Sequence, residues 1–523
     1  MNGHAVSVEP SVAGHRPARP NLVAVSDTVA RQESQNPWAT FALVAVGTFM
    51  TMLDASIVNI SLPSIARTFH RPVGGAIEWV IIAYLVTIAA TLLTFGRLSD
   101  MVGRKPVWIA GLALFTLCSG VCGAATSLPL LIVARVFQGL GGALLFSTSV
   151  AIITDSFPAE NRGFALGCNA VVIALGSSAG PVLGGLITEH WSWRWIFYVN
   201  VPIGICGLAG SQRVLRNILG TQRQRFDWLG AALLAAGFAL LTLALSFAPE
   251  WGWNSWRSLI CFGVSVAALL AVPGVERRVR DPIIDLRLLE NRVFTSALLS
   301  MTLAVLALFA VGFMLPFYFE ELRGFSVARS GLFLTVLPLA IAVVAPVSGL
   351  LADRFGSRWL ASGGLAVACL GLVGVAHLNA RSSDWEIIWP LVLVGIGQGL
   401  FMTPNARALM NAAPASEQGE SSGLLATGRV LGQSLSVALA GAIFAGLGGP
   451  EAGRSLIGAA SNDSGAAVET AAMQLRFLTG FQTALLVCAG VAAAGVFTAL
   501  IRGAETEPVR AVFTTRATTQ IRK

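Results

Sequence analysis

Long apolar runs separated by short polar turns fill the chain from Trp38 to Arg502. An apolar run of about 20 residues crosses the hydrocarbon core of a bilayer as a helix. Each run that is bounded by charges, Pro or Gly therefore predicts one membrane span. The fourteen predicted spans are 38–60, 78–99, 106–126, 129–152, 164–187, 195–212, 227–248, 256–273, 294–318, 328–351, 359–378, 386–409, 422–446 and 479–501. The pattern predicts an all-α polytopic membrane protein.

The composition excludes a water-soluble fold. Of the 523 residues, 55% are hydrophobic and 12% are charged, and the mean hydropathy is +0.72; soluble domains carry about 25% charged residues. The seven cysteines lie inside apolar runs, without the spacing of a disulfide framework or a zinc site. The polar segment 1–37 lacks apolar periodicity and is expected to be a disordered cytoplasmic tail, with a second cytoplasmic tail at 503–523.

The distribution of Arg and Lys predicts the orientation of the chain. An even number of spans places both termini on one side of the membrane. The segments on that side carry 24 of the 35 basic side chains, and the opposite segments carry 8. Cytoplasmic loops retain positive charge, so both termini are expected in the cytoplasm. This topology and attraction to the lipid bilayer account for the net charge of +8, and no nucleic-acid partner is expected.

An internal repeat divides the chain. The segments Gly96–Lys105 and Gly349–Arg358 share a pattern of Gly, Asp and basic residues and begin 253 residues apart. Weaker echoes lie at nearly the same offset, at Gln138 and Gln398 and at Gly176 and Gly428. The offset equals eight spans, so two six-helix halves are separated by two extra helices. The predicted units are an N-terminal bundle 38–215, an insertion 216–293 and a C-terminal bundle 294–502, an arrangement typical of secondary transporters.

Asp54 and Arg135 are the strongest candidates for chemistry. Asp54 lies inside the first predicted span and Arg135 inside the fourth, each about 9 Å from the outer end at 1.5 Å per residue. Charged groups at such depth are costly in lipid and indicate function. Moving Arg135 toward or away from Asp54 would load and unload a proton, because a nearby cation favours the carboxylate. The alternative is a static buried ion pair that holds the helices together.

The repeated loop is expected at the cytoplasmic surface. Glycine permits the left-handed backbone of a tight turn, and the adjacent carboxylate and arginine could form a latch between the two bundles. The alternative, a solvated basic loop, explains one copy but not the repeated spacing. The predicted gate residues are Gly96, Asp100, Gly103, Arg104 and Lys105, with Asp353 in the second copy.

Small residues recur four apart in the fifth span, which predicts a close helix–helix contact. Pro181 removes one backbone hydrogen bond and permits a bend. Simple helix packing would give the same pattern. If the contact also seals the transport path, a larger residue at one of these positions should cause a leak. The residues are Gly176, Gly180, Pro181, Gly184 and Gly185.

Polar residues inside other spans are candidates for a substrate cavity, although interhelical hydrogen bonding is the equal alternative. They are Ser56, Asn59, Tyr84, Gln138, Gln398, Asn405 and Gln433. Neither a metal-ligand spacing nor a P-loop occurs in the sequence. We therefore expect no cofactor and no metal, no enzymatic activity, and the proton gradient as the energy source.

Four strings together resemble one known family. Leu53–Pro63 resembles the LDxTIVNVALP signature of the fourteen-span drug:H+ antiporter group of the major facilitator superfamily, with Ser56 where Thr is usual. Gly96–Lys105 is similar to motif A of the superfamily, Arg135–Gly142 to motif B and Gly176–Gly185 to motif C, the antiporter motif. The second copy of motif A has Ser357 where a basic residue is common. The resemblance covers Trp38 to Arg502.

The resemblance implies a fold of two six-helix bundles with two additional central helices. It implies that Asp54 is the protonatable coupling residue and Arg135 its partner, that Asp100 and Arg104 form the cytoplasmic gate, and that Gly180 and Pro181 form the seal. The expected function is proton-coupled efflux of amphipathic drug-like or toxic molecules across a bacterial cytoplasmic membrane by alternating access. The expected partners are the small-molecule substrate and protons; the sequence does not decide whether a periplasmic adaptor takes part.

Other functions remain open at this point. The same helices could serve a proton-coupled transporter of a specific metabolite, siderophore or lipid, although motif C argues against import. A membrane enzyme should show a metal or nucleophile cluster at the membrane face, and a channel should show repeated filter loops. The sequence contains neither feature.

Overall fold

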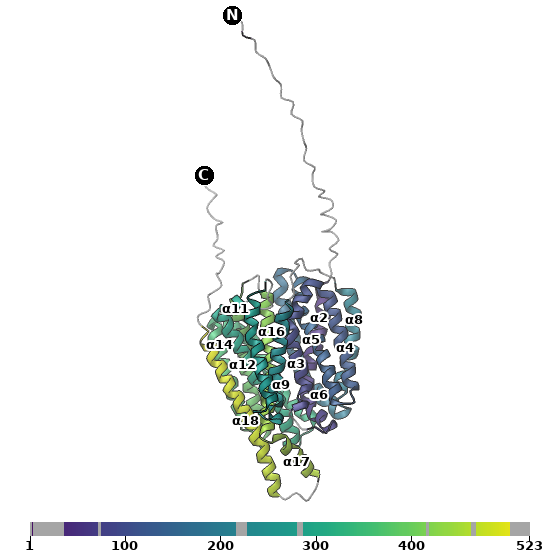
Figure 1. Ribbon diagram of the computed structural model, residues 1–523, viewed down its shortest axis with the longest axis vertical. Helices are drawn as coiled ribbons and strands as arrows, with labels where there is room; N and C mark the ends of the chain where they lie inside the picture. Colours follow the sequence, from purple (N-terminus) through teal and green to yellow (C-terminus); the bar gives the residue numbers. More distant parts are fainter. Residues whose placement is uncertain are drawn as a thin grey trace.

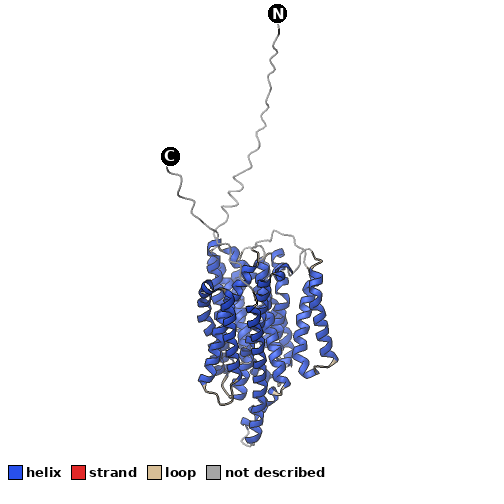
Figure 2. Cartoon of the chain, turned by 90° about the vertical axis from the view of Figure 1, so that its left-hand side faces the viewer, coloured by secondary structure: helices blue, strands red, loops and turns tan. Residues whose placement is uncertain are grey.

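The structure, a computed structural model, describes residues 3, 36–71, 75–215, 227–279, 286–414, 418–461 and 467–502. Within these ranges the chain is helical apart from short turns (Figure 2), which confirms the predicted all-α class. Thirteen helices of the described part are long and apolar enough to cross a membrane. Nearly all of the predicted tails 1–37 and 503–523 lies outside the described residues.

The predicted sixth span differs from the other thirteen because it is divided. The structure breaks the segment predicted at 195–212 into α7 (Trp195–Tyr198) and α8 (Asn200–Val214), with Val199 between them. Helix α8 has 15 residues, fewer than the roughly 20 that a single helix needs to span the hydrocarbon core. Together α7 and α8 occupy the segment predicted as the sixth span; a total of fourteen spans stays a prediction.

The N-terminal half forms one bundle. Its main contacts join α2 to α6, α3 to α5, α4 to α5 and α4 to α8. Several helices begin at side-chain caps that accept a hydrogen bond from the first turn, as Asn36 does for α2 and Ser127 does for α5. The helices are α2 (Pro37–Thr68), α3 (Trp79–Val102), α4 (Arg104–Ala124), α5 (Leu128–Ser156) and α6 (Ala159–His190), with the 3-10 turn η1 (Gly75–Ile77) before α3.

The C-terminal half forms a second bundle, and a helix hairpin lies between the two halves in the sequence. The hairpin packs through its first helix against α3 of one bundle and α16 of the other. The hairpin is α9 (Trp228–Trp251) and α10 (Trp256–Glu276). The bundle contains α11 (Leu286–Glu290), α12 (Arg292–Phe317), the π-helical turn η2 (Tyr318–Leu322), α13 (Val327–Phe355), α14 (Ser357–Ala376), α15 (Asp384–Ala412), α16 (Gln418–Gly446), α17 (Gly449–Ser461) and α18 (Ala467–Leu500).

The two bundles repeat the same close helix contact. A Cβ on Gly111 of α4 would lie 3.2 Å from the Leu145 nitrogen of α5. A Cβ on Gly364 of α14 would lie 2.8 Å from the Phe401 nitrogen of α15. Small residues at these positions let the backbones approach closely. The pair α4–α5 thus corresponds to α14–α15, as the sequence repeat predicted; the exact limits of the three units, near 216 and 293, stay a prediction.

Helix α2 begins and α18 ends at the same end of the molecule, which we name the terminal end (Figure 1). The opposite, distal end carries α17 and the first turns of α18, which project beyond the other helices (Figure 1). The sequence predicted neither α17 nor the start of α18 at Ala467. Both segments contain polar residues, so a search for apolar runs passes over them, whereas packing of α17 on α18 and η2 supports their helices.

Candidate functional site

Asp54 and Arg135 form an ion pair in the core of the N-terminal bundle. Arg135 Nη1 of α5 donates to Asp54 Oδ2 of α2 over 2.5 Å. The side chain of Asp54 is 0% exposed and that of Arg135 is 1% exposed. The structure therefore brings together the two residues that the sequence placed at the same depth.

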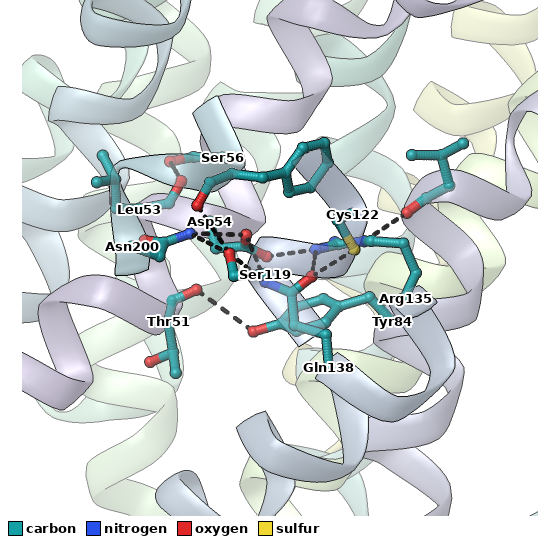
Figure 3. Close-up of polar contacts among 12 residues, drawn as sticks. Thr51, Leu53, Asp54, Ser56, Tyr84, Ser119, Cys122, Arg135, Gln138 and Asn200 are labelled. Carbon is teal, nitrogen blue, oxygen red and sulfur yellow. Dashed lines mark hydrogen bonds and ion pairs between the residues drawn. The ribbon is translucent and has the colours of Figure 1, made fainter. Parts of the chain in front are cut away.

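Two amides complete the surroundings of the carboxylate (Figure 3). Gln138 Nε2 of α5 donates to Asp54 Oδ1 over 3.0 Å, and Asn200 Nδ2 of α8 donates to the same oxygen over 3.2 Å. Ser119 Oγ of α4 accepts from both amides and donates to the Phe197 carbonyl. The hydrogen-bond network around Asp54 thus joins four helices, α2, α4, α5 and α8.

Arg135 has further contacts that do not depend on Asp54. Its Nε donates to the Val80 carbonyl of α3 over 2.8 Å, and its Nη1 donates to Gln138 Oε1 over 2.8 Å. The Tyr84 ring lies 4.2 Å from the guanidinium carbon, in cation–π contact. The guanidinium therefore keeps three partners if the bond to Asp54 is lost.

The small residues of α6 pack against both bundles. A Cβ on Gly176 would lie 2.8 Å from the Met52 Cβ of α2, and one on Gly180 would overlap the Ser56 hydroxyl. On another side of the helix, a Cβ on Gly185 would lie 2.8 Å from the Val327 carbonyl of α13. The Pro181 carbonyl in turn leaves no room for a side chain on Gly331 of α13. The predicted stripe therefore packs α6 on α2 of its own bundle and, through Pro181 and Gly185, on α13 of the other bundle.

Two polar contacts also join the bundles at the distal end. Arg67 at the end of α2 forms an ion pair of 2.7 Å with Glu320 of η2. Glu189 at the end of α6 accepts a hydrogen bond of 2.6 Å from the Ala328 amide in the first turn of α13. With the α6–α13 packing, these contacts close the distal end.

The repeated loops contain the predicted left-handed glycines. Gly103 has φ of +104° and Gly356 has φ of +78°, whereas Gly96 lies inside α3 with open space around its Cα. Arg104 pairs with Asp155 of α5, and Lys105 donates to the Gln212 carbonyl of α8 over 2.9 Å. These two contacts lie within the N-terminal bundle; the latch between the bundles stays a prediction. The side chains of Asp100 and Asp353 lie outside the described part of the structure.

Comparison with known proteins decides the family. The family model of the Major Facilitator Superfamily matches residues 44–437 and 297–523 of this chain. The chain belongs to the Major Facilitator Superfamily. As a member of this superfamily it is a multi-pass membrane protein and a transporter of small molecules.

Relatives of this superfamily member include a riboflavin transporter and two resistance proteins. It is 35% identical over 78% of its length to riboflavin transporter RibZ of Clostridioides difficile, covering 88% of that protein. It is 31% identical over 78% of its length to multidrug resistance protein Stp of Mycobacterium tuberculosis, covering 75% of it. It is 31% identical over 80% of its length to the tetracenomycin C resistance and export protein of Streptomyces glaucescens, covering 78%.

The fold of this superfamily member is also found among solved structures. A bacterial homologue of the human lysosomal transporter Spinster, in an inward-facing and unoccupied conformation, aligns with a TM-score of 0.62 at 17% sequence identity. The alignment covers 89% of this chain and 97% of that chain. This likeness confirms the fold.

Several residues predicted to line a cavity of the transporter have other partners. Gln138 belongs to the Asp54 network, and Tyr84 is buried beneath Arg135. Asn405 joins helices, because it donates to the Ala297 carbonyl of α12 and accepts from Arg502. For these residues the structure supports the alternative of interhelical hydrogen bonding.

The remaining predicted cavity residues have few polar contacts. The Ser56 hydroxyl donates to carbonyls of its own helix, and Gln398 contacts the Met402 sulfur over 3.6 Å. Asn59 is buried with an Oδ1 that has no partner among the described residues. Gln433 is partly exposed within α16.

The structure contains an apolar cavity that the sequence did not indicate. It has a volume of about 180 Å³ and lies between α3, α9, α12 and α16. Its wall is formed mainly by leucine side chains, together with three threonines, two alanines and Phe238 of the inserted hairpin. None of the predicted cavity residues lines it.

Sequence reasoning also missed Ser119 and Asn200 in the network around Asp54. Single small polar residues are common in membrane helices, where they bind neighbouring helices, so neither residue stands out. Asn200 is the first residue of α8, just beyond the break at Val199. The signal available in the sequence was the tryptophan-rich turn that precedes this break.

Proposed function

We propose that this transporter exports amphipathic drug-like or toxic small molecules across the bacterial cytoplasmic membrane in exchange for protons, as a member of the fourteen-span drug:H+ antiporter group. The buried Asp54–Arg135 pair carries the proposal. A carboxylate and an arginine inside a membrane bundle mark proton relays and ion pathways. The names of two relatives, a multidrug resistance protein and a tetracenomycin C exporter, support export as the direction.

In the proposed cycle the terminal end faces the cytoplasm, as the distribution of Arg and Lys suggests. The closed distal contacts then correspond to an inward-facing conformation. Opening of the distal contacts between α6 and α13 would give external protons access toward Asp54, and reclosure would expose the proton to the cytoplasm. Substrate would leave on the outside in the same conformational change.

The contacts of Arg135 make proton uptake feasible. Removing one partner of a buried ion pair costs about 3–5 kcal/mol when the other charge is left alone. Arg135 keeps the Val80 carbonyl, Gln138 Oε1 and the Tyr84 ring when Asp54 is protonated. These contacts offset part of the cost and hold the guanidinium ready to bind Asp54 again.

The test compares driven and exchange transport in proteoliposomes, with a panel of fluorescent amphiphiles of positive, neutral and negative charge. Wild-type protein should concentrate at least one of them when a pH gradient is applied, and collapse of the gradient should abolish accumulation. Asp54→Asn should lose gradient-driven accumulation but retain exchange of substrate across the membrane. Glu386→Gln, which alters only an exposed helix cap, serves as the control and should behave as wild type.

Accumulation by Asp54→Asn equal to that of wild type would refute coupling through Asp54. Accumulation by wild type without a pH gradient would refute proton coupling altogether.

The riboflavin transporter among the relatives favours a second candidate, a transporter of one specific metabolite. The two candidates differ in competition. Several unrelated amphiphiles should inhibit one another's transport by a drug exporter, whereas a metabolite transporter should be inhibited only by close analogues of its substrate.

A further inference from the structure

Helix α16 carries a stripe of polar side chains in its transmembrane part. The stripe consists of Ser422, Arg429, Gln433 and Ser436, at successive spacings of seven, four and three residues. Such spacings place side chains on one face of a helix. An arginine inside a membrane span is costly and usually faces the interior of a bundle, where it finds a partner.

The neighbours of α16 show that this face points to the interior. Gly428 and Gly432 pack on Thr302 of α12, and Gly423 and Gly441 pack on α3. Other residues of α16, among them Leu424 and Leu431, line the apolar cavity against α9. On a helical projection the polar stripe lies opposite the face toward α9, between the faces that contact α3 and α12. It is therefore directed to the centre, where the two bundles meet.

The register with α3 gives the depth of Arg429. Gly423 packs on Leu93 and Gly441 packs on Glu78, so the two helices run antiparallel. Along α16, Arg429 lies about a third of the way from Gly423 to Gly441. Because the rise per residue is the same in both helices, this depth corresponds to the same fraction of the way along α3 from Leu93 to Glu78. It is thus on the terminal side of Tyr84, and so of the Asp54–Arg135 pair.

The charge of Arg429 is not compensated within the described residues. Asp54 and Arg135 neutralise each other. Arg429 is half-buried as a residue, and its guanidinium has neither a hydrogen bond nor an ion pair to any residue that the structure describes. One positive charge therefore faces the centre of the molecule, on the side away from the closed distal contacts.

We propose that Arg429 binds the anionic group of the transported molecule, so that the preferred substrate is an amphipathic organic anion with a carboxylate, sulfonate or phosphate. This assignment rests on the proposed export function and specifies its substrate class. The planar guanidinium binds two oxygens of such groups at once. Gln433, one turn along the stripe, supplies an amide donor beside it.

The experiment measures binding to the purified full-length protein in lipid-free detergent, using three probes with one naphthalene body: a sulfonate, the neutral sulfonamide and a quaternary ammonium. Wild type should bind the sulfonate at least tenfold more tightly than either other probe. Arg429→Gln should weaken sulfonate binding at least tenfold and leave sulfonamide binding unchanged, which also shows that the variant is folded. Arg429→Lys should give an intermediate affinity.

Arg381→Gln is the matched control, because it removes one positive charge from an exposed distal turn and should leave all three affinities unchanged. Equal affinity of wild type and Arg429→Gln for the sulfonate, or no preference of wild type for the sulfonate, would overturn the assignment. A lipid phosphate is the other source of an anion. If added phosphatidylglycerol displaces the sulfonate and the sulfonate is not transported by proteoliposomes, the site is a lipid site and the substrate assignment is wrong.

These outcomes are independent of proton coupling, because binding in detergent requires no gradient. If Asp54→Asn accumulates substrate as well as wild type does, coupling through Asp54 is refuted and the binding result is unaffected.

Discussion

At the scale of single residues, the central site depends on how completely its polar groups are paired. Asp54 accepts from three side chains on two helices, and each donor except Arg135 is an uncharged amide. The sequence could identify Asp54 and Arg135 because charges in apolar runs are rare. It could not identify Ser119 or Asn200, whose roles depend on the rotation of α4 and α8 about their axes.

Gln138 and its repeat counterpart Gln398 provide a matched test of this network. Gln138 binds Asp54, Arg135 and Ser119, whereas Gln398 contacts only the Met402 sulfur among described residues. Gln138→Ala should lower the free energy of unfolding by about 1–3 kcal/mol, because buried partners lose hydrogen bonds. Gln398→Ala should have a much smaller effect. Thermal melting in detergent measures both, and equal losses would contradict the importance of the network.

Glu78 is a buried carboxylate that the proposed mechanism does not use. It is 0% exposed, both its oxygens lack a partner within the described residues, and it lies against Gly441 of α16. Glu78→Gln should raise the melting temperature, because the folded state no longer removes an ionisable group from water. Glu250→Gln is the control: this nearby acid is exposed, so its replacement should shift melting less. A lower melting temperature for Glu78→Gln would show that the carboxylate is stabilising.

At the scale of elements, glycine contacts let α6 pack closely on helices of both bundles. Helix α6 approaches α2 through Gly176, Gly180 and Gly184, and it approaches α13 through Pro181 and Gly185. The sequence predicted the close contact from the spacing of small residues. Only the structure shows that one helix serves both bundles.

Gly331→Ala tests the contact of α13 with α6. The added methyl group would overlap the Pro181 carbonyl, so we expect the distal contacts to open more often. Gly363→Ala in α14 is the control, since a Cβ there meets nothing within 4 Å. Maleimide labelling of Ala328→Cys, in a background with the seven native cysteines replaced, measures opening. Gly331→Ala should label several-fold faster than the control, and equal rates would show that the contact does not restrain opening.

At the scale of the whole molecule, two polar contacts join the bundles at the distal end. The ion pair of Arg67 with Glu320 joins α2 to η2, and Glu189 joins α6 to α13. Both contacts must break if the distal end opens.

Breaking the Arg67–Glu320 pair should shift this equilibrium. The Arg67 side chain is 45% exposed, whereas the Glu320 side chain is 2% exposed, so removing Arg67 leaves a buried carboxylate without its counter-charge and costs more than the roughly 0.2–1 kcal/mol of a fully exposed pair. Arg67→Gln should therefore raise distal labelling of Ala328→Cys by more than about fivefold, the factor that 1 kcal/mol gives. Arg329→Gln breaks the ion pair with Asp384 inside the C-terminal bundle and should leave labelling unchanged. An equal increase in both variants would mean that net charge, not the contact between bundles, controls opening.

The sequence by itself determined the membrane character, the approximate spans, the repeated halves and the two charged residues of the central site. These properties are local, because the thickness of a bilayer and the cost of a charge in lipid act on each segment separately. Only the tertiary structure decided which amides bind Asp54, that α6 joins the bundles at the distal end, that Gln138 lies in the network, and that Arg429 has no counter-charge among the residues that the structure describes. Each of these depends on the rotation and crossing of helices far apart in the chain, which their apolar periodicity does not specify.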